Sequence, residues 1–213
     1  WLIAEHMKAH SLDEMDENCR IIGATNTVIN EDGYLKGYNT DMDGFLEPIK
    51  NRNITIKDSN VLLLGSGGAA RAIIAGMAKE KAKEVTIINR TKEHATELKE
   101  FSINIGLDAE VKSITEMNDL HTDYNFIINS SSLGLKNESN IVPPEIINEE
   151  TIVYDIVYKP VNTELIKESK KKNAEIIYGY EMLLSQAIRS FEIWLGMEAP
   201  YDTMKKAILG GFS

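Results

Sequence analysis

The sequence has almost no cysteine, since Cys19 is the only one among 213 residues. An internal disulfide is therefore impossible, and this use of cysteine favours a reducing, cytoplasmic setting. A single thiol could still act as a nucleophile. No activating partner is visible beside Cys19 in the sequence, which favours a structural thiol over a nucleophile.

An excess of positive charge, metal-ligand spacing and long apolar runs are also missing. The net charge is −10 and the pI is near 5.0, which argues against nonspecific nucleic-acid binding. The four histidines show no metal-ligand spacing. No apolar run approaches the roughly 20 residues of a membrane span. We therefore expect a protein without nucleic-acid, metal or membrane partners.

From Val61 onward, β-rich runs and helical patterns alternate along the chain. Such alternation predicts an α/β fold with a parallel, doubly wound sheet. The expected strands are 61–64, 84–88, 110–111, 124–128, 151–158 and 175–178, and the expected helices are 69–79, 93–101, 163–173 and 181–195.

The region before this alternation has a different pattern. Residues 1–20 predict a helix, a hairpin with an Asp-Gly turn follows over 21–38, and helical spacing resumes over 42–50. The sequence therefore predicts three segments. They are a front region at 1–50, a nucleotide-binding domain at 51–194, and a C-terminal helical segment at 195–213 that returns to the front region.

A glycine cluster after the strand at 61–64 carries the nucleotide signal. Gly65, Gly67 and Ala70 fit the dinucleotide fingerprint G-x-G-x-x-A. Gly65 permits a sharp turn, Gly67 lets backbone amides approach a pyrophosphate, and Ala70 lets the helix pack close to the strand. The N-terminus of the following helix favours the anion. A glycine-rich turn without a ligand remains the alternative.

The next strand ends in Asn89-Arg90-Thr91, where an acidic residue usually binds the ribose 2′-hydroxyl of NAD. Arg90 instead offers a planar cation, and its two neighbours offer hydrogen bonds. This set suits a 2′-phosphate, so the sequence favours NADP over NAD. The alternative is an arginine on a solvated strand end.

Two polar clusters stand outside the nucleotide domain. One is Asn26 between two threonines, and the other is Asn39-Thr40-Asp41. Their hydrogen-bonding groups suit a polyol substrate, and Asp41 could also serve in proton transfer. Asn and Asp also bond local backbone in turns, and spacing alone favours that explanation.

Seven motifs together resemble the shikimate dehydrogenase family in order and spacing, from about Leu12 to the C-terminus. They lie at 23–27, 37–41, 65–70, 89–91, 129–131, 155–158 and 179–186. The resemblance implies a Rossmann-like NADP domain beside an α/β substrate domain. It also implies an NADP-dependent oxidoreductase that reversibly reduces 3-dehydroshikimate to shikimate, a step of chorismate and aromatic amino-acid biosynthesis.

The resemblance further implies roles for individual residues. The catalytic position falls on Asp41, where the family's aspartate binds substrate and partners a lysine. The substrate-binding positions fall on Asn26, Asp41, Tyr158 and Gln186. The cofactor positions fall on Gly65, Ser66, Gly67, Gly68, Ala69, Asn89, Arg90, Thr91, His94, Ile156 and Gly179. The expected partner is a small-molecule substrate, and a homodimer is compatible with the resemblance.

The sequence also departs from the family. It has neither the Ser-x-Ser motif nor the N-V-T-x-P-x-K segment with the catalytic lysine, and Lys8 stands at the wrong spacing. We therefore expect an incomplete substrate domain, and a 213-residue chain that binds NADP(H) but reduces 3-dehydroshikimate poorly. The alternative is a nonenzymatic dinucleotide-binding or regulatory module.

The Arg90→Ala variant should lose much more affinity for NADPH than for NADH, because only NADPH carries the 2′-phosphate. Titration of the protein with each cofactor checks this difference. The Gly67→Val variant is the control, since a side chain there blocks the pyrophosphate and should weaken both cofactors. Equal losses of NADPH and NADH affinity in Arg90→Ala would contradict the 2′-phosphate assignment.

Overall fold

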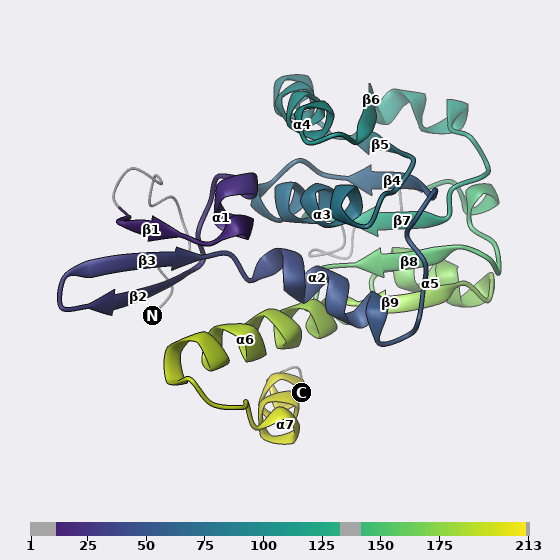
Figure 1. Ribbon diagram of the computed structural model, residues 1–213. Helices are drawn as coiled ribbons and strands as arrows, with labels where there is room; N and C mark the ends of the chain where they lie inside the picture. The colour runs from purple at the N-terminus through teal and green to yellow at the C-terminus, as the bar shows by residue number, and fades with distance from the viewer. Residues whose placement is uncertain (1–11, 133–141, 212–213) are drawn as a thin grey trace.

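Two β-sheets and the helices around them form the described part of the chain, which is residues 12–132 and 142–211 of a computed structural model (Figure 1). None of the helices in these two ranges is long and apolar enough to cross a membrane. The elements in chain order are β1 (Glu14–Met15), α1 (Glu17–Ile22), β2 (Thr27–Glu31), β3 (Tyr34–Tyr38), α2 (Asp41–Lys50), β4 (Asn60–Leu64), α3 (Gly68–Lys79), β5 (Glu84–Ile88), α4 (Lys92–Asn104), β6 (Asp108–Lys112), η2 (Ile114–Asp119), β7 (Phe126–Asn129), η3 (Pro144–Ile146), β8 (Ile152–Asp155), α5 (Glu164–Lys171), β9 (Glu175–Tyr178), α6 (Gly179–Leu195) and α7 (Tyr201–Gly210).

The larger sheet is parallel throughout, with the strand order β6-β5-β4-β7-β8-β9. The chain enters the middle of the sheet at β4, moves outward through β5 and β6, and then returns to β7 on the other side of β4. This is the Rossmann strand order, and it confirms the predicted doubly wound sheet. The order reverses between β4 and β7. Sheets of this kind bind ligands at that point, beyond the carboxyl ends of the strands.

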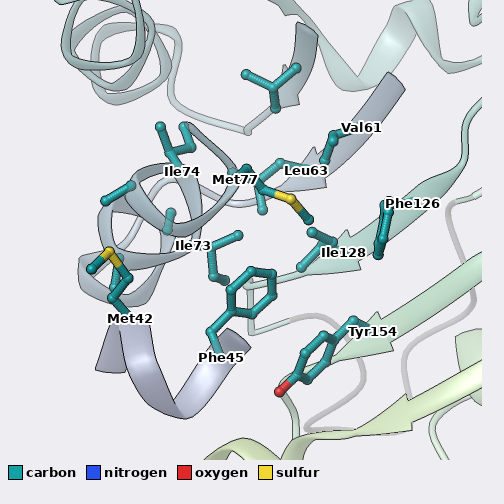
Figure 2. Close-up of a cluster of buried hydrophobic side chains, with 14 of the residues drawn as sticks. Met42, Phe45, Val61, Leu63, Ile73, Ile74, Met77, Phe126, Ile128 and Tyr154 are labelled. Carbon is teal, nitrogen blue, oxygen red and sulfur yellow. The ribbon is translucent and has the colours of Figure 1, made fainter. Parts of the chain in front are cut away.

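Alternate residues of the central strands pack on opposite faces of this sheet, as the two-residue repeat of a strand requires. Leu63 of β4 belongs to one buried core with α2, α3 and α4, and Leu64 belongs to another with α5. Figure 2 shows the first core, where Met77 of α3 lies over the sheet. Phe45 of α2 stacks on Tyr154 of β8, with ring centroids 5.0 Å apart. The helix α2 is therefore anchored on the larger sheet, although it lies in the front region of the sequence.

The front region forms a three-stranded sheet of order β1-β3-β2. β1 runs parallel to β3, and β2 and β3 form the predicted antiparallel hairpin. Asp32 and Gly33 connect them with φ angles of 53° and 95°. Both angles are positive, as a two-residue hairpin turn requires, and this explains the Asp-Gly pair.

The helix predicted over residues 1–20 is confirmed at residues 17–20 and wrong at residues 12–16. Glu14 and Met15 form a strand, and the helix α1 begins only at Glu17 and runs through Ile22, a residue that the sequence pattern assigns to the hairpin. The Asp16 side chain caps α1 by accepting a hydrogen bond of 2.7 Å from the Cys19 backbone N–H. Residues 1–11 lie outside the described residues, so the rest of that prediction is untested.

The helices α2 and α6 lie side by side, and α6 reaches from the end of β9 to the front sheet (Figure 1). The two helices pack tightly at Gly44. A Cβ atom at this position would lie 2.6 Å from the Gln186 Cβ and 2.9 Å from the Gln186 backbone nitrogen. The Arg52 guanidinium after α2 pairs with the Glu181 carboxylate at the start of α6, at 2.9 Å. The contact between the two helices therefore depends on the absence of a side chain at Gly44.

The Gly44→Ala variant should lower the free energy of unfolding by about 1–3 kcal/mol, because an added methyl group overpacks the contact between α2 and α6. Denaturant-induced unfolding measures this loss. Gly210→Ala in α7 is the matched control, since a Cβ there meets no atom within 4 Å and alanine favours a helix. A Gly44→Ala protein as stable as the unmodified protein would refute the account of this contact.

Candidate active site

A cavity of about 400 Å³ lies at the carboxyl ends of β4, β5 and β7, where the strand order reverses. The loops after these three strands and the start of α4 form its walls. Its lining residues are Leu64, Gly65, Ser66, Gly67, Ile88, Asn89, Arg90, Thr91, His94, Ile114, Ser130, Ser131 and Ser132. The cavity thus lies where a doubly wound sheet binds a nucleotide.

The glycines of the fingerprint give this cavity the shape that a pyrophosphate needs. Gly65 has a φ of +98°, and a Cβ there would lie 2.8 Å from the Ser131 backbone nitrogen. Gly67, by contrast, has no atom within 4 Å of where its Cβ would lie, so its surroundings are open. It caps the N-terminus of α3 without a side-chain hydrogen bond, and the first N–H groups of that helix stay available for an anion. The residues present therefore fit a dinucleotide.

The other end of the cavity is basic. Arg90 is exposed after β5, and the neighbouring Asn89 side chain donates a hydrogen bond of 2.8 Å to the Thr91 carbonyl. Within the described ranges, no carboxylate lines this cavity. An adenosine 2′-phosphate would therefore meet the Arg90 cation without electrostatic repulsion from an acidic side chain.

A second polar site joins the two sequence clusters of the front region. The Asn26 Nδ2 group donates to the Asp41 Oδ1 atom at 2.9 Å, and the Asn26 Oδ1 atom accepts from the Thr40 backbone N–H at 3.0 Å. The start of β2 and the start of α2 thereby bring Asn26 and Asp41 together. Gln186 of α6 joins them through Thr40, whose Oγ1 lies 3.4 Å from the Gln186 Oε1.

Asp41 is the titratable group of this cluster. Burial raises the pKa of its carboxyl, while the hydrogen bond from Asn26 acts in the opposite direction. A carboxylate with few partners in a desolvated position gains from any added donor, such as a substrate hydroxyl or a cation. The cluster is therefore suited to bind a polyol.

A buried carboxylate also organises the loops after β7 and β8. The Asp155 side chain is fully buried, and it accepts hydrogen bonds from the Asn129 Nδ2 group at 2.9 Å and the Thr163 Oγ1 group at 2.5 Å. It also accepts from the Val157 backbone N–H at 3.1 Å. Burial raises the pKa of this carboxyl. Asp155 therefore fixes the loop that leads from β8 to Tyr158.

The predicted site residues are distributed between these places. Among the predicted cofactor residues, Gly68 and Ala69 stand outside the cavity lining, at the start of α3. Gly179 lies close to Ile156, because a Cβ on Gly179 would clash with the Ile156 carbonyl; neither residue lines the cavity. Tyr158 is 47% exposed in the loop after β8.

Sequence reasoning did not assign a role to several residues in these places. Ile114 and Ser132 line the cavity, and Ser190 bonds within the second polar site. Only Ser190 carried a usable signal, since it lies four residues after Gln186 and therefore on the same face of a helix. Cys19 is 1% exposed, and burial raises the pKa of its thiol to about 12, which agrees with a structural thiol.

The parallel sheet and the glycine-lined cavity define the class of dinucleotide-binding α/β proteins. Family models identify the particular family within that class. The model described as "Shikimate / quinate 5-dehydrogenase" matches residues 48–156, and the one described as "Shikimate 5'-dehydrogenase C-terminal domain" matches residues 179–209. The chain therefore belongs to the shikimate dehydrogenase family.

Individual relatives agree with this assignment. The chain is 63% identical over 201 residues to shikimate dehydrogenase (NADP(+)) of Nitrosopumilus maritimus, a match that covers 94% of this chain and 74% of that protein. Shikimate 5-dehydrogenase from Thermus thermophilus, solved in complex with NADP(H) and shikimate, is 32% identical with a TM-score of 0.78, over 93% of this chain and 72% of that one.

A structural relative is named for a different activity. The ligand-free form of 5-ketofructose reductase from a Gluconobacter strain is 30% identical with a TM-score of 0.83, over 95% of this chain and 74% of that one. The same scaffold therefore occurs in enzymes with different named substrates, so the polar site rather than the fold must carry the argument about the substrate.

The Asp155→Ala variant should destabilise the protein by about 1–3 kcal/mol for each buried donor that loses its acceptor. These donors are the side chains of Asn129 and Thr163 and the Val157 backbone N–H. Thermal unfolding checks the loss, with the exposed Asp108→Ala in β6 as control. Similar unfolding temperatures for both variants would show that Asp155 does not organise these loops.

Proposed function

We propose that this protein catalyses the reversible, NADP-dependent reduction of 3-dehydroshikimate to shikimate. The observation that carries the proposal is the hydrogen-bonded pair of Asn26 and Asp41, which occupies the family's substrate motifs beside Thr40, whose Oγ1 lies 3.4 Å from the Gln186 Oε1. The family assignment and the open glycine turn at the cavity support the same function.

We assign the cofactor to the cavity at the strand ends. The N–H groups at the start of α3 would bind the pyrophosphate, and Arg90 with its neighbours would bind the 2′-phosphate. When bound, NADP(H) supplies or accepts the hydride. The remaining proposed cofactor residues, Ile156 and Gly179, directly follow β8 and β9 and lie against each other at the start of α6.

We assign the substrate to the polar cluster of the front region. Asn26 and Asp41 would bind substrate hydroxyls, and Gln186 and Tyr158 would contact the substrate from the side of the nucleotide domain. The Asp41 carboxylate would also hold a cationic proton donor, the lysine that partners this aspartate in the family, next to the substrate's carbonyl oxygen. A carboxylate beside a cation favours the charged form of both groups. Fixed orientation of the substrate toward the nicotinamide accounts for much of such catalysis.

The division into segments at 1–50, 51–194 and 195–213, a homodimer and a cytoplasmic location stay predictions. A protein that binds NADP(H) without turnover is the competing function. The two are distinguished by the complete gene product, assayed with NADPH and 3-dehydroshikimate. Consumption of NADPH that depends on 3-dehydroshikimate supports the enzyme, and cofactor binding without consumption supports the competing function.

The Asp41→Asn variant of that protein should lose about 10²–10⁴-fold in kcat/KM, which is the usual contribution of a positioned proton-transfer group. Its NADPH affinity should stay unchanged, because Asp41 lies in the polar cluster and is absent from the lining of the cofactor cavity. Steady-state kinetics and a cofactor titration measure both quantities. Undiminished turnover would contradict the assignment of Asp41.

Measuring the stability of the same variant tests whether misfolding causes its loss of activity. Burial raises the pKa of the Asp41 carboxyl above its unfolded value, so the folded state binds the proton more tightly than the unfolded state. The stabilisation from this carboxyl is complete below the unfolded pKa and is lost as the pH rises through the folded pKa. Asp41→Asn should therefore be at least as stable as the unmodified protein at pH 7. Any advantage in stability over the unmodified protein should shrink as the pH falls through the pKa of Asp41. A large loss of stability at pH 7 would contradict this.

A further inference from the structure

Ser190 has no assigned role, although it lies at the centre of the most buried polar contacts in the front region. It is 6% exposed on α6, and its Oγ atom lies 2.8 Å from the Thr27 Oγ1 and 3.1 Å from the Thr40 Oγ1. Thr27 and Thr40 are each 1% exposed. Three hydroxyl groups from β2, from the start of α2 and from α6 therefore meet in a place with little access for water.

The available protons restrict how these hydroxyls can bond, because each of them has only one. The Thr27 hydroxyl lies 3.1 Å from the Asn26 Oδ1, an atom that can only accept, and donates to it. The Ser190 hydroxyl therefore donates to the Thr27 Oγ1 at 2.8 Å rather than to the Gln186 carbonyl of its own helix at 3.0 Å, and its oxygen accepts from Thr40. When Thr40 donates to Ser190, a lone pair of Thr40 faces the Asn26 Nδ2 group, which lies 3.0 Å away and donates to it.

The same contacts determine the orientation of the Asn26 carboxamide. Its Oδ1 atom accepts from the Thr40 backbone N–H at 3.0 Å and from the Thr27 Oγ1 at 3.1 Å. Its Nδ2 atom donates to the Asp41 carboxylate at 2.9 Å. Rotating the amide by half a turn would place an oxygen against this carboxylate. A fixed orientation is therefore necessary for Asn26 to support Asp41.

We propose that Ser190 is a positioning residue of the substrate site, which acts through Thr27 and Thr40 to hold the Asn26 carboxamide in the orientation that faces Asp41. The proposal rests on the proposed function for the identity of the substrate. Ser190 makes no hydrogen bond to Asp41 and does not line the cofactor cavity, so its effect on the Asn26 carboxamide passes through the two threonines.

Without the Ser190 hydroxyl, the Thr40 proton turns to one of its two other acceptors. These are the Asn26 Oδ1 at 3.3 Å and the Gln186 Oε1 at 3.4 Å. Thr27 likewise loses its shortest contact. Water is not expected to replace the missing hydroxyl at full strength, because the site is closed to solvent. The carboxamide then samples other orientations, and substrate hydroxyls meet a less ordered site.

The test compares Ser190→Ala with Ser169→Ala in the complete protein. Ser169 of α5 is the matched control, since it is fully buried and its hydroxyl donates to the Leu165 carbonyl four residues earlier, at 2.7 Å. Both hydroxyls lie within hydrogen-bond distance of the carbonyl four residues earlier in their helix, but only Ser190 also contacts the threonines. Steady-state kinetics, an NADPH titration and the NMR signal of the Asn26 side-chain amide, assigned with Asn26→Asp, are measured for each.

Ser190→Ala should raise the KM for 3-dehydroshikimate about threefold to tenfold, as expected for the loss of one hydrogen bond. It should leave kcat and NADPH affinity nearly unchanged, and it should shift the Asn26 amide signal, whereas Ser169→Ala should do none of these. An unchanged KM and amide signal, or equal changes in both variants, would overturn the proposal. Absence of turnover in the unmodified protein would contradict the proposed function instead, and the amide signal would still decide the role of Ser190.

Discussion

The close approach of α2 to α6 at Gly44 is the constraint on which the polar cluster and its placement beside the larger sheet depend. α2 packs on the larger sheet through Phe45, and its first residue, Asp41, belongs to the polar cluster of the front region. α6 begins at the end of β9 and carries Gln186 and Ser190 to the same cluster. A side chain at position 44 would separate the two helices by pushing against Gln186. The hydrogen bonds across this contact would lengthen with that separation.

This arrangement connects two sites with different physical chemistry. The cofactor cavity is built from loops at strand ends, with backbone N–H groups and one exposed arginine that suit a phosphate. The polar cluster is built from side chains of β2, α2 and α6, where burial makes each unmatched donor or acceptor costly. Because α6 starts at Gly179, beside Ile156, and continues to Ser190, a single helix fixes the distance between the ends of the strands and the cluster.

The sequence predicted the larger sheet well, because local patterns determine it. Alternation of apolar runs with helical spacing located β4 to β9, and the glycine fingerprint located the cavity. The prediction from sequence patterns failed before Glu17, where capping by Asp16 rather than periodicity decides the start of α1. The spacing from Gln186 places Ser190 on the same face of a helix, but its contacts could not be predicted. Its partners Thr27 and Thr40 lie 163 and 150 residues away and meet it only through the packing of β2 and α2 on α6.

The central claim is that this protein transfers a hydride between NADPH and 3-dehydroshikimate. The most direct measurement uses NADPH that carries deuterium at the transferable position of C4, together with the complete protein, and determines the mass of the product. The account predicts shikimate with deuterium bound to the carbon that was the carbonyl carbon. Formation of no shikimate, or of shikimate without deuterium, would contradict it.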